Sequence, residues 1–295
     1  MKEIVVLSGK GGTGKTSLTA AFAFLAGPGI VVADSDVDAS NLHLLLKPEA
    51  IKPEPFFSGL QAVIDPSVCS GCGACLDVCR FSAIGEREGL FRVIGINCEG
   101  CGYCSRICPE NAISMADQKT GDWYLSRTRT GQTMIHARLQ AGGENSGKLV
   151  AKVKNEARAA AKRENLEMIL IDGPPGIGCP AISSLSGAGL AILVTEPTLS
   201  GYHDLTRVYE LTKSFNIPAA CIINKYDLNP EVGNKIMEFQ KDNGIMHLAS
   251  IPYTEVFTKC LTKGLTVTES SHDDLKGVIR ESWEKILEIK QKTNG

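Results

Sequence analysis

The chain has 295 residues, 43 % of them hydrophobic and 22 % charged, with a formal net charge of -2, which is typical of a soluble globular protein of about two domains. The balanced charge and the lack of a Lys- or Arg-rich run argue against a nucleic-acid partner. No run approaches the roughly 18 apolar residues of a membrane span, so we expect no integral membrane association.

Short apolar runs rich in β-branched residues alternate with stretches of helix length along most of the chain. The first run leads straight into a glycine loop, so we interpret it as a strand and not as a signal peptide. In chain order the pattern predicts strand 3–7, helix 15–25, strand 30–33, helix 148–163, strand 168–171, strand 190–194, helix 202–215, strand 219–223 and helix 230–241. This alternation predicts the α/β class, with a doubly wound, mostly parallel sheet.

Residues 53–118 interrupt the alternation with prolines, dense glycine and most of the cysteines. We therefore expect a nucleotide-binding core in two parts, 1–52 and 119–295, with a small inserted α+β domain at 53–118. Residues 121–147 are assigned to no element. Apolar residues from Leu275 to Leu287 recur at helical spacing, and the polar residues 291–295 that follow favour a helix packed on the sheet over a membrane anchor.

The insert holds eight of the eleven cysteines, in two runs offset by 29 residues. The runs are Cys69-x2-Cys72-x2-Cys75-x3-Cys79 and Cys98-x2-Cys101-x2-Cys104-x3-Cys108-Pro109. Without an export signal, this spacing indicates metal ligands in a reducing cytoplasm and not disulfides of a secreted protein. Tetrahedral zinc is the alternative, since C-x2-C pairs also bind Zn2+.

This spacing resembles that of bacterial two-cluster ferredoxins. The resemblance implies two 4Fe-4S clusters with crossed ligation, in which the last cysteine of each run serves the other cluster. Cluster I would then use Cys69, Cys72, Cys75 and Cys108, and cluster II would use Cys98, Cys101, Cys104 and Cys79. One departure from the pattern is Arg80, which stands where a proline is expected.

The glycine loop reads Gly9-x4-Gly14-Lys15-Thr16 between a predicted strand and a predicted helix. Glycines let backbone N–H groups face a β-phosphate, Lys15 supplies a charge, and Thr16 offers its hydroxyl to Mg2+. Asp172 ends the predicted strand 168–171, so its carboxylate should emerge at the ligand-binding edge of the sheet and serve the same Mg2+.

A second lysine, in Lys10-Gly11-Gly12-x-Gly14-Lys15-Thr16, makes this loop unusual. Here the chain resembles the MinD/ParA/Mrp family of P-loop ATPases, which includes the nitrogenase iron protein. Further matching segments are Asp34-Ser35-Asp36-Val37-Asp38, Asp172-Gly173-Pro174-Pro175-Gly176, Asn224-Lys225 and Ile251-Pro252-Tyr253.

The resemblance implies a homodimer that encloses two nucleotides, with Lys10 crossing to the partner's phosphates. Catalysis would rest on Lys10, Lys15 and Asp36, where Asp36 positions or activates water and joins Thr16 and Asp172 at Mg2+. Asp38 would lie in the first switch, from Asp36 to Leu46, and Gly176 would sense the γ-phosphate. The implied nucleotide contacts are Gly9, Lys10, Gly11, Gly12, Thr13, Gly14, Lys15, Thr16, Ser17, Asp38, Gly176, Asn224, Lys225, Pro252 and Tyr253.

The base is open to two interpretations. The segment Asn224-Lys225-Tyr226-Asp227 matches the guanine-reading pattern N-K-x-D, whose carboxylate accepts hydrogen bonds from guanine. The longer family pattern favours ATP, with Asn224 against adenine and the Pro252 loop lining it. Asp227 would then be a turn residue before Asn229-Pro230.

Three cysteines lie outside the insert. Cys179 occupies the place of a cluster ligand in the nitrogenase iron protein, but we favour a small buried residue beside Pro180 at a helix start. Cys221 and Cys260 are predicted to be packing residues.

Our leading interpretation is an ATP-hydrolysing iron–sulfur protein in which nucleotide-dependent dimer changes gate electron flow to a redox partner protein. An iron–sulfur assembly or carrier ATPase and a MinD-like regulatory ATPase are the alternatives, because a fold does not determine a function.

The cysteine spacing yields a stoichiometry that can be measured. Anaerobically purified protein should contain about eight irons and about eight acid-labile sulfides per chain, as two cubane clusters require. Colorimetric iron and sulfide assays with elemental analysis check this. Zinc in place of iron, or half the expected iron, would contradict the two-cluster interpretation.

Overall fold

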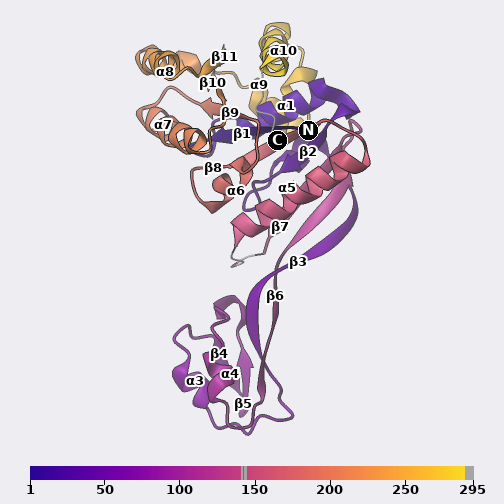
Figure 1. Cartoon of the computed structure of the whole chain (residues 1–295), viewed down its shortest axis with the longest axis vertical. Helices are drawn as coiled ribbons and strands as arrows, with labels where there is room; N and C mark the ends of the chain where they lie inside the picture. Colours follow the sequence, from indigo (N-terminus) through magenta and orange to yellow (C-terminus); the bar gives the residue numbers. More distant parts are fainter. Residues whose placement is uncertain (141, 143–144, 290–295) are drawn as a thin grey trace. The chain divides into compact units, whose positions relative to one another are not determined.

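The computed structural model describes residues 1–140, 142 and 145–289 as two compact units (Figure 1). The larger unit, unit 1, comprises Met1–Glu54, Trp123–Arg138 and the chain from Ser146 on. The smaller unit, unit 2, comprises Pro55–Asp122 and Leu139–Asn145.

A nine-stranded sheet has the order β11-β10-β9-β1-β8-β2-β7-β6-β3. Neighbouring strands from β11 through β7 pair in parallel, so the α/β class with a mostly parallel sheet is confirmed. The five predicted strands are present as β1 (Lys2–Ser8), β2 (Val31–Asp34), β8 (Met168–Pro175), β9 (Leu190–Thr195) and β10 (Ala219–Asn224), and the sheet also contains β11 (Met246–Ile251), β7 (Thr133–Leu139), β6 (Ile113–Arg127) and β3 (Glu49–Ile64).

The four predicted helices are confirmed as α1 (Lys15–Ala26), α5 (Ser146–Arg163), α7 (Leu199–Ser214) and α8 (Pro230–Asp242). The shorter helices of unit 1 are α2 (Leu42–Leu46), α6 (Cys179–Leu185) and α9 (Val256–Lys263). The predicted C-terminal helix is also present, as α10 (Asp273–Glu288).

The core of unit 1 lies on both faces of the central strands. Ile4 and Val6 of β1 join a fully buried cluster with α1 and α10, in which the Phe22 and Trp283 rings stack at 5.5 Å. Val5 and Leu7 are equally buried and point to the opposite face, because side chains alternate along a strand. The packing of α10 in this core confirms the choice of a packed helix over an anchor, although residues 291–295 lie outside the described chain.

The segment left unassigned by the sequence, 121–147, contains the end of β6 and all of β7. β7 carries His136 and Arg138 among its apolar residues and therefore lacks the continuous apolar run of the inner strands. It joins the sheet by pairing in parallel with β2 from Val31↔Thr133 to Asp34↔His136. Residues 141 and 143–144 of that segment lie outside the described chain.

Unit 2 repeats a short backbone motif. Its helices α3 (Ala74–Val78) and α4 (Tyr103–Ile107) are offset by the same 29 residues as the cysteine runs. The left-handed residues recur at the same offset, as Gly71 and Gly100, Gly73 and Gly102, and Ser82 and Asn111. A hairpin of β4 (Ile84–Arg87) and β5 (Leu90–Val93) lies between the two copies in the chain.

The described part of the chain contains no helix that is both long and apolar enough to cross a membrane.

Candidate functional site

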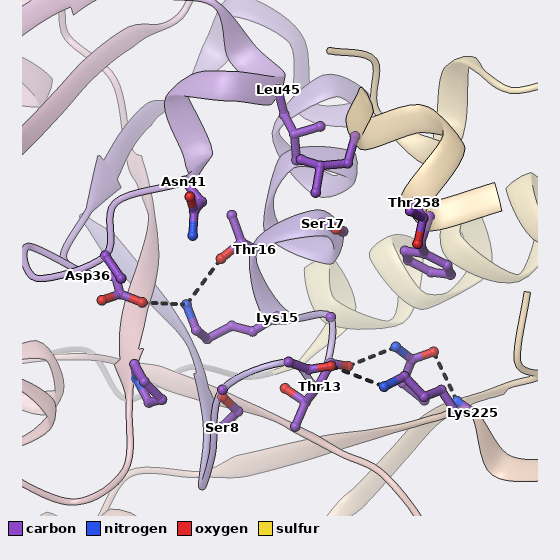
Figure 2. A pocket seen from close by; sticks show the side chains of 18 of the residues that line it. Ser8, Thr13, Lys15, Thr16, Ser17, Asp36, Asn41, Leu45, Lys225 and Thr258 are labelled. Atoms are coloured by element: carbon purple, nitrogen blue, oxygen red, sulfur yellow. Dashed lines mark hydrogen bonds and ion pairs between the residues drawn. The ribbon is translucent and has the colours of Figure 1, made fainter. Parts of the chain in front are cut away.

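The glycine loop of unit 1 joins β1 to α1 and forms one wall of a cleft of about 530 Å3 (Figure 2). Gly12 and Gly14 have φ angles of 80° and 94°, which L-residues with side chains rarely adopt. A Cβ atom on Gly14 would lie 2.5 Å from Asn224 Nδ2. The glycines therefore allow a turn that directs loop N–H groups and the α1 N-terminus into the cleft, as an anion site requires.

Asp172 is the centre of the polar contacts at the sheet edge. Its fully buried carboxylate lies 3.0 Å from Lys15 Nζ and accepts hydrogen bonds from the hydroxyls of Thr16 (2.7 Å) and Thr19 (2.9 Å). Because its hydrogen goes to Asp172, the Thr16 hydroxyl keeps lone pairs for a cation. As in P-loop proteins, the Thr16 hydroxyl is therefore suited to bind Mg2+ directly. Asp172 is suited to support the ion through groups that are themselves bound to it.

Asp36 faces the cleft from the loop after β2, with Oδ2 3.9 Å from Lys15 Nζ (Figure 2). Burial raises the pKa of Asp36, Lys15 lowers it and Asp172 raises it, with a net shift upward. The carboxylate is therefore placed beside the phosphate-facing lysine, where it can accept a hydrogen bond from a water molecule.

Asp34 is a buried group to which the sequence interpretation gave no role. It lies in register with Asp172 on the neighbouring strand, and burial together with Asp172 raises its pKa to about 7. Its carboxylate accepts hydrogen bonds from the Asp36 backbone N–H at 3.1 Å, from Ser40 Oγ at 2.6 Å and from the Leu42 backbone N–H at 3.3 Å. Asp34 therefore fixes both ends of the segment that leads from Asp36 to α2, and its position as the last residue of a buried strand was the available signal.

Lys10 and Lys225 share one carboxylate. Glu196, which follows β9, lies 2.7 Å from Lys10 Nζ and 2.8 Å from Lys225 Nζ. Burial raises the pKa of Glu196, but its hydrogen bonds to the two lysines outweigh this and leave the pKa lowered. Lys10 also donates to the hydroxyls of Thr198 at 3.2 Å and Ser200 at 3.0 Å, so within one chain this lysine is held beside the N-terminus of α7.

The cleft brings together eleven of the predicted site residues, namely Gly11, Gly12, Thr13, Gly14, Lys15, Thr16, Ser17, Asp36, Asn224, Lys225 and Tyr253. Asn224 donates to the Thr13 carbonyl at 2.7 Å, which fastens the β10 end to the glycine loop. The predicted residues that do not line the cleft are Gly9, Lys10, Asp38, Asp172, Gly176 and Pro252.

The two predicted glycines that do not line the cleft, Gly9 and Gly176, have packing and turn roles in this structure. A Cβ on Gly9 would lie 2.3 Å from Asp204 Cβ, so glycine is required where the loop crosses α7. Gly176 has a φ of 84° and donates its N–H to the Ser8 carbonyl at 2.9 Å, which ties the loop after β8 to the end of β1. Asp38 is exposed.

The far wall of the cleft was missed by sequence reasoning. It is formed by Leu45 of α2 together with Thr254, Phe257, Thr258 and Leu261, which lie in and just before α9. No motif marks these residues; only their position after the Pro252 segment could have suggested them. They give the cleft an apolar side opposite the phosphate loop, as a nucleotide base requires.

Asp227 does not line the cleft. Its Oδ1 accepts a hydrogen bond from the Tyr253 backbone N–H at 2.6 Å. The carboxylate therefore holds the segment that carries Tyr253 and Thr254, and one of its oxygens is already engaged.

In unit 2 the eight cysteines of the two runs line two separate pockets. One pocket is lined by Cys79, Cys98, Cys101 and Cys104, and the other by Cys69, Cys72, Cys75 and Cys108. Burial raises the pKa of the Cys104 thiol, and the neighbouring sulfurs of Cys98, Cys101 and Cys79 contribute to the rise. The last cysteine of each run therefore lies with the first three of the other run.

Backbone N–H groups point at the sulfur atoms that cross between the runs. Ala83 N donates to Cys79 Sγ and Ala112 N donates to Cys108 Sγ, both at 3.3 Å. Hydrogen bonds of this kind stabilise a thiolate and tune a cluster bound to it. The two contacts are equivalent in the 29-residue repeat.

Within the described residues, no three His, Cys, Asp or Glu side chains are arranged to hold a metal ion. A 4Fe-4S cluster differs from a single ion because each of its four irons takes one thiolate. The relevant grouping for a cluster is therefore four cysteines around a pocket, and the crossed sets have this arrangement.

The three other cysteines are free. Cys221 and Cys260 are buried, which confirms them as packing residues, and burial raises the pKa of the Cys221 thiol. Cys179 does begin α6 beside Pro180, but the prediction that it is buried is wrong. It is exposed because it occupies the first turn of the helix, on the side away from Ala181 and Leu185, which point into the core.

Comparison with known proteins agrees with this geometry. The model of the CobQ/CobB/MinD/ParA nucleotide-binding domain matches residues 4–267. A Methanocaldococcus jannaschii protein, MJ0578, is 35 % identical over 290 residues, 97 % of each chain. An iron-sulfur cluster carrier protein of Rickettsia bellii is 29 % identical over 126 residues, which cover 42 % of this chain and 39 % of that protein.

Solved structures show the same fold. The cell division ATPase MinD of Pyrococcus furiosus is 20 % identical and superimposes with a TM-score of 0.58, covering 98 % of this chain and 99 % of that one. The ATP complex of a Cyanothece McdA variant is 18 % identical with a TM-score of 0.59, covering 100 % and 99 %.

The Asp227 contact separates base reading from loop support. Asp227→Asn keeps an oxygen acceptor for the Tyr253 N–H and should leave ATP affinity within about two-fold, whereas Asp227→Ala should weaken it about five-fold, the loss of roughly one hydrogen bond. Isothermal titration with ATP and GTP checks this, with Asp242→Ala on α8 as the control. A selective loss of GTP binding in Asp227→Asn would show instead that the carboxylate reads guanine.

Proposed function

The chain belongs to the CobQ/CobB/MinD/ParA nucleotide-binding domain family, and we propose that it is an ATP-hydrolysing iron–sulfur protein. Unit 1 binds and hydrolyses ATP, and unit 2 holds two 4Fe-4S clusters whose electron exchange with a protein partner is gated by the nucleotide. The observation that carries the proposal is the crossing of the cysteine runs into two pockets of four.

The residues of the cleft support nucleotide hydrolysis. Lys15 and the loop N–H groups bind the phosphates. Thr16 and Asp172 hold Mg2+, and the hydrogen bond between them orients the Thr16 hydroxyl for this. Asp36 accepts a hydrogen bond from the attacking water and orients it. This arrangement stabilises the charge that develops on the transferred phosphoryl group.

Adenine is the base that we propose for the apolar wall. Asp227, the residue of the guanine-reading pattern, supports the Tyr253 segment and does not line the cleft. Phe257 and Leu261 of α9 offer apolar surface that suits a purine ring.

A homodimer completes the site in this proposal. Lys10 leaves Glu196 and reaches the partner's nucleotide, so Glu196 acts as its resting partner in the single chain. The exchange replaces one ion pair with another, which keeps the charge of Lys10 compensated in both states.

The eight thiols are the ligands of the two clusters, which supply one-electron transfer at low potential when bound. Zinc is the weaker alternative because two structural zinc sites do not require three cysteines at x2-x2 spacing with a fourth from the other run. The N–H groups of Ala83 and Ala112 stabilise the Cys79 and Cys108 thiolates.

A second candidate, an iron–sulfur cluster carrier, is favoured by one observation. The Rickettsia bellii relative carries that description, although it matches less than half of this chain. In a carrier the clusters are cargo, so iron would leave the protein for an acceptor apoprotein, whereas in the leading proposal it stays bound.

The two lysines of the loop should differ in their effects. Lys15→Ala should abolish ATP binding because it removes the charge that faces the phosphates and leaves Asp172 buried without its cation. Lys10→Ala should retain most of the ATP affinity but no longer dimerise, and its hydrolysis rate should fall about ten-fold or more. The reason is that the phosphate contact of Lys10 forms only across the dimer. Titration calorimetry, light scattering and phosphate release measure these effects, with exposed Lys213→Ala on α7 as the control. Equal loss of binding in both variants would remove the cross-dimer role.

The proposed gating requires that nucleotide state and cluster potential are coupled. We expect each midpoint potential to differ between nucleotide-free, ADP-bound and non-hydrolysable-ATP-bound protein, because hydrogen bonding and solvent exposure set cluster potentials. Linkage makes the effect reciprocal, so reduction should change ATP affinity by the same coupling free energy, about 1 to 3 kcal/mol where such coupling exists. Redox titration followed by electron paramagnetic resonance measures it, with Lys15→Ala as the control. Identical potentials in all three states would favour the carrier.

A further inference from the structure

Because of the 29-residue repeat, each residue around one cysteine pocket can be compared with the residue at the equivalent position around the other. Four positions around them are equivalent in the repeat but differ in chemistry. The pocket of Cys79, Cys98, Cys101 and Cys104 has Arg80, Phe81, Glu99 and Tyr103 at these positions, and all four line it. The equivalent residues of the other copy are Pro109, Glu110, Ser70 and Ala74.

The substitutions concentrate aromatic and charged groups around one pocket. Phe81 is 44 % exposed and Tyr103 is 53 % exposed, so neither ring fills the core of unit 2. Arg80 and Glu99 are exposed as well. One thiol of each pocket is exposed, Cys101 here and its equivalent Cys72 in the other copy. The copy with Ala74 and Ser70 has no aromatic ring at either position, and the aromatic residue that lines the other pocket, Phe91, is half-buried.

We propose that the surface formed by Arg80, Phe81, Glu99 and Tyr103, the cluster II face, is where a soluble redox protein docks to exchange electrons with unit 2. The inference rests on the proposed function, since it requires a cluster in that pocket. The partner has an apolar centre around its own cofactor edge, flanked by a basic group that meets Glu99 and an acidic group that meets Arg80.

The chemistry of the face fits a transient redox encounter. Electron-transfer interfaces are among the smallest specific interfaces, and aromatic residues and arginine are enriched at interface centres. A pair of opposite charges sets the orientation and the association rate more than the affinity. In the exchange, one electron passes from the reduced cluster, which is oxidised, to the partner's cofactor, which is reduced. No bond is made or broken and no proton is transferred.

The test uses the intact protein with both clusters, verified by iron and sulfide content, so that a failure to bind clusters is recognised first. Cytochrome c, a basic one-electron acceptor protein, serves as the probe for the dithionite-reduced protein. Glu99→Lys and Glu110→Lys change the net charge by the same amount. Glu99 lies on the cluster II face, whereas Glu110 lies in the other copy, at the position equivalent to Phe81.

In stopped-flow measurements at low salt, Glu99→Lys should lower the second-order rate constant for cytochrome c reduction about five-fold or more, and Arg80→Glu should raise it. Both effects should fade at high salt. Glu110→Lys should change the rate less than about two-fold, and a neutral quinone oxidant should react equally with all variants. An equal or larger effect of Glu110→Lys would overturn the assignment while leaving the proposed function intact.

A binding readout completes the test. Carbodiimide cross-linking of the oxidised protein to cytochrome c, mapped by peptide mass spectrometry, should join the acceptor to Glu99 in preference to Glu110. Cross-links at Glu110 in equal or greater yield, or at neither residue, would contradict a docking site at the cluster II face.

Discussion

The buried carboxylate of Asp172 is the contact on which the arrangement of the nucleotide site depends. It has no access to solvent, and Lys15 with two threonine hydroxyls satisfies it. Removing one partner of a buried ion pair costs several kcal/mol because the other charge is left uncompensated. The pair therefore fixes the glycine loop and the start of α1 against β8.

The parallel sheet explains why so many polar groups meet there. Asp34 and Asn224 end β2 and β10, Glu196 follows β9, and Asp172 lies in the second half of β8. Parallel strands bring their carboxyl ends to one edge of the sheet. Asp34 extends this network to the segment that carries Asp36, and Glu196 connects it to Lys10 and Lys225. Direct hydrogen bonds and ion pairs thus hold the segment before α2 and the two lysines Lys10 and Lys225 at this edge of the sheet.

Unit 2 has a different source of stability. Among the described residues of unit 2, the buried members of its apolar cluster are Ala62, Cys75, Ile84 and Ile113. Four other cysteines of the two runs pack against them. A unit of this size supplies a marginal core, and metal binding is one of the usual ways in which small domains gain stability. In our proposal the clusters bound by the thiols take the place of a larger apolar core. Cluster binding and folding of the unit are then one process.

The sequence by itself determined the periodic strands and helices of unit 1, the glycine loop and the two cysteine runs, because these depend on local spacing. The crossed grouping of the cysteines came from the resemblance to two-cluster ferredoxins, and the structure brings the same groups of four cysteines to two pockets. The sequence did not reveal the exposure of Cys179. It also did not reveal β7, because polar residues interrupt the apolar pattern by which a buried strand is predicted. The tertiary structure decided which residues form the wall across from the phosphate loop, since the short connection after β11 brings α9 to the cleft. It also engaged Asp227 with Tyr253 and Lys10 with Glu196, contacts that join residues 26 and 186 positions apart. Such pairings follow from the order of strands in the sheet, which no local pattern encodes.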